Sequence, residues 1–181
     1  LHPQARLTLH STNTEMVLKA VVEQRADVGL IEGPAHSRDV VVEPWLEDEL
    51  VLVVPANHEW TELAELDPAK LLRAPLLMRE RGSGTRDIVE HALNAAGVPA
   101  KKLHLRMELN STEAILASVE AGLGVGFTSR RALRRQLQLG TLRMIPLRGV
   151  QIRRQLSLLY RRGPEKKAIG TALVAFLRSK A

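Results

Sequence analysis

The alternation of short apolar runs with capped amphipathic segments constrains this sequence most. Stretches with the apolar spacing of strands alternate along the chain with stretches of helical spacing. The predicted strands cover 5–10, 27–31, 49–55, 74–78, 103–109, 124–129, 142–147 and 155–160. The predicted helices start near Thr12 and then cover 86–96, 111–121, 132–139 and 165–180. Strands that alternate with helices predict an α/β fold with a mostly parallel sheet.

The composition excludes several classes of protein. The 181 residues include no cysteine, which rules out thiol catalysis, iron–sulfur clusters, cysteine zinc sites and disulfide frameworks. The longest apolar run, Leu50–Ala56, is too short to cross a bilayer. No secretory signal and no initiator Met are present, so we expect a fragment or processed product that is cytoplasmic and has no membrane partner. An aromatic content of 3% argues against base-stacking RNA modules.

Charge is distributed unevenly along the chain. Residues 130–181 hold 14 Lys and Arg and one acid, Glu165, whereas residues 1–129 hold 12 Lys and Arg and 19 acids. Such asymmetry can indicate contact with nucleic acid or a partner. The alternative interpretation is that the arginines lie on solvated faces of helices and strands, and both interpretations stay open here.

Three predicted strand-to-helix junctions share one chemistry: Ser11–Thr14, Gly82–Arg86 and Asn110–Thr112. Each places small hydroxyl, amide or glycine residues at a helix N-terminus, where free backbone N–H groups and the helix dipole favour an anion. At the carboxyl edge of a parallel sheet, such junctions bind ligands. The alternative is ordinary capping, and Thr12 and Asn110 have the spacing of N-caps.

Three arginines close in sequence to the second junction make an anionic or polar ligand as well supported as plain capping, and both interpretations stay open here. The three arginines are Arg79, Arg81 and Arg86.

Signatures of catalysis and of metal or cofactor binding are missing. Arg81–Gly84 is not a nucleophile elbow, and Gly122–Gly126 imitates a dinucleotide fingerprint but precedes a strand. The six histidines lack metal-ligand spacing. The acids Glu47–Glu49 are interpreted as a solvated turn. We therefore expect no catalytic residue, no metal and no cofactor, and not an enzyme.

Five stretches follow one another with a familiar order and spacing across nearly the whole chain. They are Ser11–Glu15, Arg25–Pro34, Glu49–Pro55 with His58, Arg79–Arg86, and Asn110–Ala114 followed by Val119–Phe127. Together they resemble the effector-binding domain of LysR-type transcriptional regulators. Ile31–Pro34 and Gly82–Arg86 are most similar to the branch that includes regulators of carbon-fixation and cysteine genes.

The resemblance implies an α/β fold of two Rossmann-like lobes joined by two crossover strands, the type 2 periplasmic-binding-protein-like fold. Lobe I would comprise residues 1–54 plus 161–181, and lobe II residues 55–160. The crossover strands would be 49–55 and 155–160. The winged helix-turn-helix of the family and the first strand and helix of lobe I do not precede Leu1, so lobe I is expected to be N-terminally truncated.

The resemblance also implies a function: an effector-sensing domain that binds a small anionic metabolite between the lobes and modulates transcription. The implied effector-binding residues are Ser11, Asn13, Thr14 and Glu32 in lobe I, and Ser83, Gly84, Thr85 and Asn110 in lobe II. The implied partners are the small-molecule effector, further copies of the chain (a dimer, or a tetramer in the full-length parent), and DNA only through the missing N-terminal domain. Two alternatives share the fold: a solute-binding protein of a transport system, and an enzyme.

Overall fold

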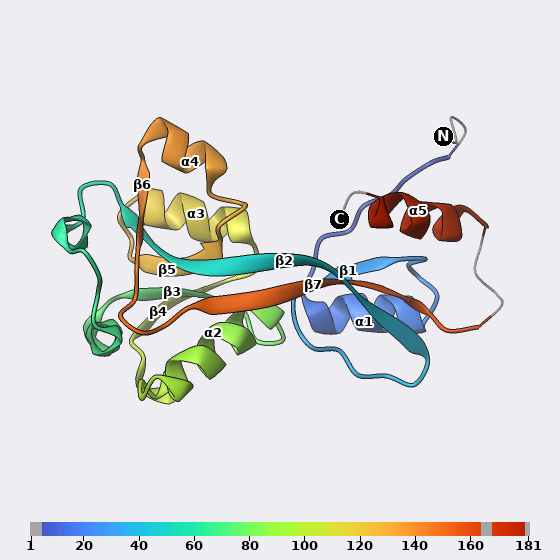
Figure 1. Cartoon of the computed structure of the whole chain (residues 1–181), viewed down its shortest axis with the longest axis horizontal. Coiled ribbons are helices and arrows are strands. Elements are labelled where there is room, and N and C mark those ends of the chain that lie inside the picture. Colours follow the sequence, from blue (N-terminus) through green and yellow to red (C-terminus); the bar gives the residue numbers. More distant parts are fainter. Residues whose placement is uncertain (1–4, 164–167, 180–181) are drawn as a thin grey trace. The chain divides into compact units, whose positions relative to one another are not determined.

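The computed structural model describes residues 5–163 and 168–179, and the chain divides into two compact units (Figure 1). Unit 1 comprises the described residues up to Leu46 and from Gln155, and unit 2 comprises Glu47–Arg154. Both divisions fall inside long strands. The predicted lobe boundaries, 54/55 and 160/161, lie near the carboxyl ends of these same two strands.

The sheet of unit 2 has mixed strand directions. Its order is β2 (Val40–Pro55), β5 (Val125–Ser129), β3 (Leu76–Arg79) and β4 (Leu105–Leu109), and β6 (Leu142–Ile145) also pairs with β2. β3 runs parallel to β4 and β5, whereas β2 is antiparallel to β5 and β6. The prediction of a mostly parallel sheet is therefore wrong. The spacing of apolar residues within a strand does not indicate whether the neighbouring strands run parallel or antiparallel to it.

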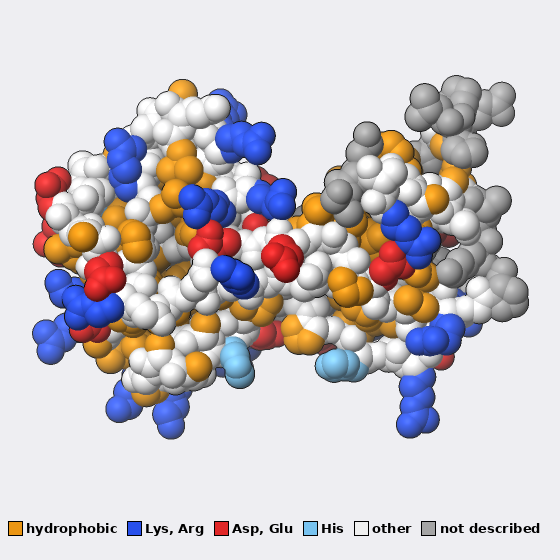
Figure 2. Space-filling view, viewed as in Figure 1, with side chains coloured by type: hydrophobic (Ala, Val, Ile, Leu, Met, Phe, Trp, Pro, Cys, Tyr) orange, Lys and Arg blue, Asp and Glu red, His pale blue; other side chains and the backbone are white. Residues whose placement is uncertain are grey.

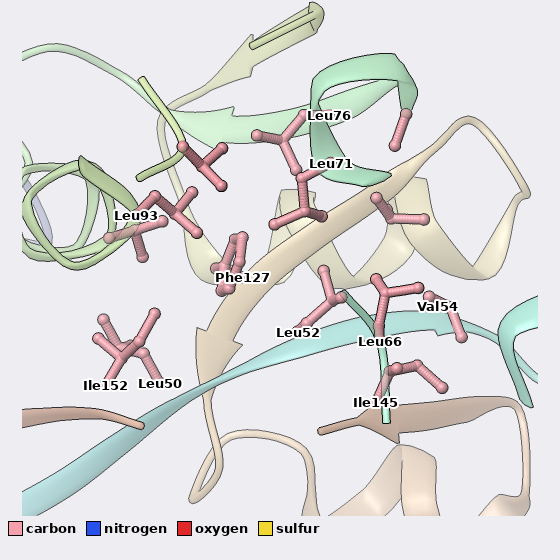
Figure 3. Close-up of a cluster of buried hydrophobic side chains, with 14 of the residues drawn as sticks. Leu50, Leu52, Val54, Leu66, Leu71, Leu76, Leu93, Phe127, Ile145 and Ile152 are labelled. Atoms are coloured by element: carbon pink, nitrogen blue, oxygen red, sulfur yellow. The ribbon is translucent and has the colours of Figure 1, made fainter. Parts of the chain in front are cut away.

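Both faces of this sheet are covered by apolar side chains. Leu50, Leu52 and Val54 of β2 belong to one buried cluster, which Figure 3 shows, and Val53 belongs to a second cluster with Leu77. Successive side chains of a strand point to opposite faces, so a strand buried on both faces is a continuous apolar run. Complete burial of each such side chain contributes about 1.5–3 kcal/mol. This accounts for the uninterrupted apolar sequence 50–54.

Helices and turns complete unit 2. The α-helices are α2 (Gly84–Ala95), α3 (Thr112–Glu120) and α4 (Arg134–Leu139), and the 3-10 helices are η1 (Glu59–Glu62), η2 (Pro68–Arg73) and η3 (Ala100–Lys102). One glycine of the 122–126 run is required by close packing. A Cβ on Gly124 would lie 2.2 Å from the backbone oxygen of Pro75. The run precedes β5, as predicted.

Unit 1 is built on β7 (Ile152–Arg161), which pairs with β1 (Gly29–Ile31) in antiparallel register. Helix α1 (Thr14–Val22) packs with Leu159 of β7, and α5 (Ala168–Arg178) packs with Leu158. Because Leu158 and Leu159 point to opposite faces, the two helices cover opposite sides of this part of the sheet. The predicted helix 165–180 is confirmed where it is described, and its ends lie outside the described residues.

The predicted strand 5–10 is wrong. These residues have no regular structure, and Leu7 and Leu9 are 76% and 90% exposed. The strand β1, which should have completed a βαβ unit with this segment, pairs instead with β7. A period-two pattern forms a strand only where a neighbouring strand supplies hydrogen bonds, so local spacing alone cannot establish one.

Two predicted N-caps are each one residue away from the observed cap. Asn13, rather than Thr12, caps α1, and its side-chain oxygen accepts from the backbone N–H of Met16 at 3.0 Å. Ser111, rather than Asn110, caps α3, and its hydroxyl accepts from the backbone N–H of Ala114 at 3.0 Å. Sequence spacing cannot distinguish two neighbouring polar residues as the N-cap. The residue with extended backbone and a side chain that accepts from the first turn is the cap.

Ion pairs within each unit compensate much of the uneven charge. Arginines of the basic segment 130–181 pair with acids of the segment 1–129. The pairs are Arg130–Glu49, Arg148–Glu65, Arg154–Asp48 and Arg178–Glu43. Basic and acidic side chains are interspersed on the face that Figure 2 shows. The side chains of Arg130, Arg148 and Arg178 are more than half exposed, as the solvated-face interpretation expects, whereas Arg154 is buried. Among the described residues, none of the helices has the length and apolar character of a membrane span.

Tyr160 is the single tyrosine of the chain, and it joins β7 to α5 in unit 1. Its hydroxyl donates to Glu43 Oε2 at 2.7 Å, and Arg178 pairs with the same carboxylate. Burial, reinforced by the hydrogen bond to Glu43, raises the pKa of Tyr160 above its ordinary value. This raised pKa favours the neutral phenol in the folded state.

We expect the stabilisation from the Tyr160 contact to be complete below the ordinary tyrosine pKa, about 10, and to be lost as pH rises through the raised value. The free energy of unfolding, measured by denaturant titration between pH 8 and pH 12, tests this, and phenolate absorbance reports Tyr160 alone. The variant Tyr160→Phe should lose this part of the alkaline dependence. A folded-state tyrosine pKa at or below the unfolded value would contradict the prediction.

Candidate functional site

Two of the predicted junctions lie at one edge of the unit 2 sheet. β3 and β4 are parallel neighbours, and the backbone N–H of Glu80 donates to the carbonyl of Leu109 at 3.0 Å. α2 follows β3 and α3 follows β4, so both helices begin at the carboxyl edge. The end of β5 lies there as well, and Ser129 is paired with Leu50 of β2. Segments distant in sequence therefore meet at this edge.

The N-terminus of α2 is buried. Ser83 is the N-cap and is 1% exposed, Thr85 is 5% exposed, and Gly84 lies buried between them. The Ser83 side chain makes no capping hydrogen bond, although its carbonyl accepts from Asp87 at 3.1 Å. Gly82 precedes them with φ of 82°, a conformation that favours glycine. Of the predicted effector residues, Ser83, Gly84 and Thr85 therefore form one continuous buried group.

The hydroxyl of Thr85 is joined to a buried ion pair. Arg154 Nη1 donates to Thr85 Oγ1 at 2.8 Å, and Arg154 Nε and Nη2 each lie 2.7 Å from Asp48 Oδ2. The side chains of Arg154 and Asp48 are 3% and 1% exposed. Ser129 Oγ donates to Asp48 Oδ1 at 2.8 Å. The four residues, Asp48, Thr85, Ser129 and Arg154, come from β2, α2, β5 and β7, and we call them the Asp48–Arg154 network.

Sequence reasoning missed three members of this network. Asp48 was interpreted as part of a solvated turn, which is wrong, because it lies in β2 and is buried. A signal for Arg154 existed in the alternation of inward and outward side chains along the strand. Ile152 and Arg154 are buried, and Arg153 between them is exposed. A period-two count from Ile152 places Arg154 on the inner face.

Two of the three arginines near the second junction, Arg79 and Arg86, are held by carboxylates, and Arg81 is exposed. Arg86 forms ion pairs with Glu90 at 2.6 Å and Glu108 at 2.5 Å, and also donates to the carbonyl of Arg79 at 3.1 Å. Arg79 pairs with Glu80 at 2.8 Å. These two side chains therefore brace the β3–α2 loop, and the guanidinium that bonds the Thr85 hydroxyl is that of Arg154.

The remaining predicted residues are placed as follows. In unit 1, Asn13 caps α1 and Thr14 begins it, both half-buried; Ser11 is exposed before the helix, and Glu32 follows β1 and is half-buried. In unit 2, Asn110 is exposed and precedes the cap of α3. The unit 1 residues and the α2 group therefore lie in different units.

Each unit also has a hollow away from these residues. In unit 2, a cavity of about 330 Å³ is lined by β2, β5 and β6, with Leu52, Phe127 and Ile145 among its walls. In unit 1, an open hollow of about 520 Å³ lies around His36 and Arg162. Neither is lined by a predicted effector residue. Hydrogen bonding, rather than cavity size, therefore identifies the candidate site. No group of three or more His, Asp or Glu within the described residues could hold a metal ion.

Comparison with known families identifies the chain. The family model of the LysR substrate binding domain matches residues 1–181. The chain belongs to this family. The regulator YeiE of Escherichia coli strain K12, described as an uncharacterized HTH-type transcriptional regulator, is 39% identical over 176 residues, which are 97% of this chain and 58% of that protein. The probable RuBisCO transcriptional regulator of Porphyra purpurea is 30% identical over 161 residues, 87% of this chain and 51% of that protein.

Solved structures of LysR regulatory domains share the fold. The CcmR regulatory domain of Synechocystis PCC6803, in complex with 2-PG, superimposes with a TM-score of 0.87 at 23% identity, covering 99% of this chain and 85% of that one. The effector binding domain of QuiR, in complex with shikimate, gives a TM-score of 0.80 at 14% identity, covering 93% and 78%. The predicted LysR-type, periplasmic-binding-protein-like α/β fold is confirmed. This chain spans about half of the curated LysR-type relatives it matches.

Proposed function

We propose that this chain is the effector-sensing part of a LysR-type transcriptional regulator and that it binds a small anionic metabolite. The observation that carries the proposal is the start of α2, where Ser83, Gly84 and Thr85 are buried and the Thr85 hydroxyl accepts from the guanidinium of Arg154. Backbone N–H groups, the helix dipole and a hydroxyl solvate an anion at such a turn. The complexes of CcmR with 2-PG and of QuiR with shikimate support a small polar ligand.

The predicted residues of unit 1 belong to the same proposal. Ser11, Asn13, Thr14 and Glu32 would supply further contacts to the effector, because the first turn of α1 offers the same backbone chemistry as that of α2. Thr14 is half-buried at that turn.

A sensing role is favoured over transport or catalysis. The relatives that match most of this chain are named as transcriptional regulators. We propose that the parent protein acts in the cytoplasm as an oligomer and contacts DNA through a region outside these 181 residues, since the chain spans 58% of YeiE. The chain itself is proposed to have no enzymatic activity and to need no cofactor.

A ligand screen tests the proposed function. The chain would be titrated with 2-PG, shikimate, inorganic phosphate and sulfate, with glucose as a neutral control, by calorimetry and thermal unfolding. An effector at about 100 times its dissociation constant adds about 2.7 kcal/mol, which corresponds to about 5–11 °C for a chain of this size. Saturable binding by at least one anion is expected. Binding of none of the four anions, or of glucose alone, would overturn the proposal.

Self-association of the chain is expected to be weak and sensitive to salt. Arg130, Arg148 and Arg178 pair with acids of their own unit, which reduces but does not remove the positive charge of the 130–181 segment that could attract a second copy. The Debye length, over which charges attract, shortens from about 30 Å at 0.01 M salt to about 10 Å at 0.1 M, so any charge-driven dimer should dissociate over that range of salt concentration. Sedimentation at both salt concentrations measures this. A strictly monomeric profile at low salt and high protein concentration would contradict it.

A further inference from the structure

The Asp48–Arg154 network lies where the chain passes from one unit to the other. Asp48 is the second residue of unit 2 on β2, and Arg154 is its last residue on β7. Both strands continue into unit 1. The same guanidinium donates to Thr85 in the first turn of α2. One buried side chain therefore joins a proposed effector residue to the two connecting strands.

We propose that Arg154 is a positioning residue, which holds the Thr85 hydroxyl for the effector and couples the occupancy of that site to β2 and β7. The proposal rests on the proposed function, because it takes the first turn of α2 as the effector site. Arg154 acts through Thr85, and Asp48 acts through Arg154.

Stability alone is a weak reason for this arrangement. A buried ion pair gains little over well-packed apolar residues, because the desolvation of both charges opposes their attraction. A cation is also disfavoured beside a helix N-terminus, where the helix dipole is positive. The arrangement therefore works against electrostatic preference at α2, and Asp48 is the group that keeps the guanidinium in place. A positioning role explains why the charge is directed at Thr85.

The geometry of the guanidinium explains how position would be transmitted. Its planar fork places Nε and Nη2 on one carboxylate oxygen of Asp48 and Nη1 on Thr85. Because the fork is rigid, a displacement of Thr85 must rotate or shift the group that Asp48 holds. Ser129 bonds the other carboxylate oxygen, which connects β5 to the same network. A lysine at position 154 would keep the charge and lose the fork.

A double-mutant cycle tests the positioning role, with 2-PG as the probe in calorimetry at a temperature where every variant is folded. Arg154→Lys and Thr85→Val are each expected to weaken 2-PG binding about tenfold or more. The double variant should bind 2-PG at most about twofold more weakly than Thr85→Val alone, since the effects of residues in one network are not additive. Thr85→Ser, which keeps the hydroxyl, should retain affinity within about threefold. The matched control is Arg148→Lys. Arg148 belongs to an exposed ion pair of unit 2, so this variant should leave the affinity for 2-PG unchanged.

Additive losses in the cycle, or an Arg154→Lys variant with normal affinity and only a lower melting temperature, would overturn the positioning role. If 2-PG does not bind the wild-type chain, the cycle uses whichever anion of the ligand screen does. If none of them binds, the proposed function fails, and the coupling is then decided without ligand. Hydrogen exchange would be compared for peptides covering α2, β2 and β7. Thr85→Val should speed exchange around Asp48 and Arg154, and Arg154→Lys should speed it around Asp87, whose N–H bonds Ser83. The coupling would be refuted if exchange stayed unchanged around Asp48 and Arg154 in Thr85→Val and around Asp87 in Arg154→Lys.

Discussion

The variant Asp48→Asn is expected to lower the free energy of unfolding by about 3–5 kcal/mol, because it removes one charge of the buried Asp48–Arg154 ion pair. The Asp48 and Arg154 side chains are 1% and 3% exposed, so water cannot replace the lost carboxylate without opening the structure. For a chain of this size, about 2–4 °C is lost per kcal/mol, so a fall in melting temperature of about 6–20 °C is expected.

A surface pair provides the control for this measurement. Arg148 and Glu65 lie 2.6 Å apart with side chains 61% and 48% exposed, and such exposed pairs contribute about 0–1 kcal/mol. Glu65→Gln should therefore change the melting temperature only slightly. If Asp48→Asn and Glu65→Gln proved equally mild in chemical denaturation, the Asp48–Arg154 network would not be the buried ionic contact described here.

The variant Thr85→Val is expected to weaken binding of an anionic effector about ten- to hundredfold. A hydrogen bond to a charged group contributes about 1.5–3 kcal/mol, and valine has the shape of threonine without its hydroxyl. The same change removes the acceptor of Arg154 Nη1, so the free energy of unfolding should also fall by about 1–3 kcal/mol. Calorimetry and denaturant titration separate the two effects.

Thr85→Ser supplies the matched comparison, since it keeps the oxygen that Arg154 Nη1 bonds and removes only a methyl group. Its affinity for the effector is expected to remain close to that of the wild type, with a small loss of stability. Unchanged affinity in Thr85→Val for an anion that binds the wild type would exclude Thr85 from the effector site. Loss of affinity in both variants alike would indicate that packing, rather than the hydroxyl, is what the ligand needs.

Local sequence pattern was sufficient for most of the elements of unit 2. The apolar run at 50–54 predicts a strand buried on both faces, and it lies in the middle of the unit 2 core as part of β2. The helix predicted at 86–96 corresponds to α2, Gly84–Ala95. These features depend on side-chain periodicity and capping, which neighbouring residues determine. The motif order was likewise sufficient for the family, which the match over residues 1–181 confirms.

Only the tertiary structure decided how those elements pair and which charges are buried. The segment 5–10 has the spacing of a strand but no strand beside it, whereas β2 begins at Val40, earlier than its apolar run, and has β7 as a neighbour. Arg154 finds Asp48 across 106 residues of sequence and Thr85 across 69. Such contacts depend on strand register between distant segments, and register is set by the packing of the whole sheet. The sequence by itself determined the fold family and the junction at Gly82–Arg86. The folded chain determined that Ser83, Gly84 and Thr85 are buried there and which charged group bonds Thr85.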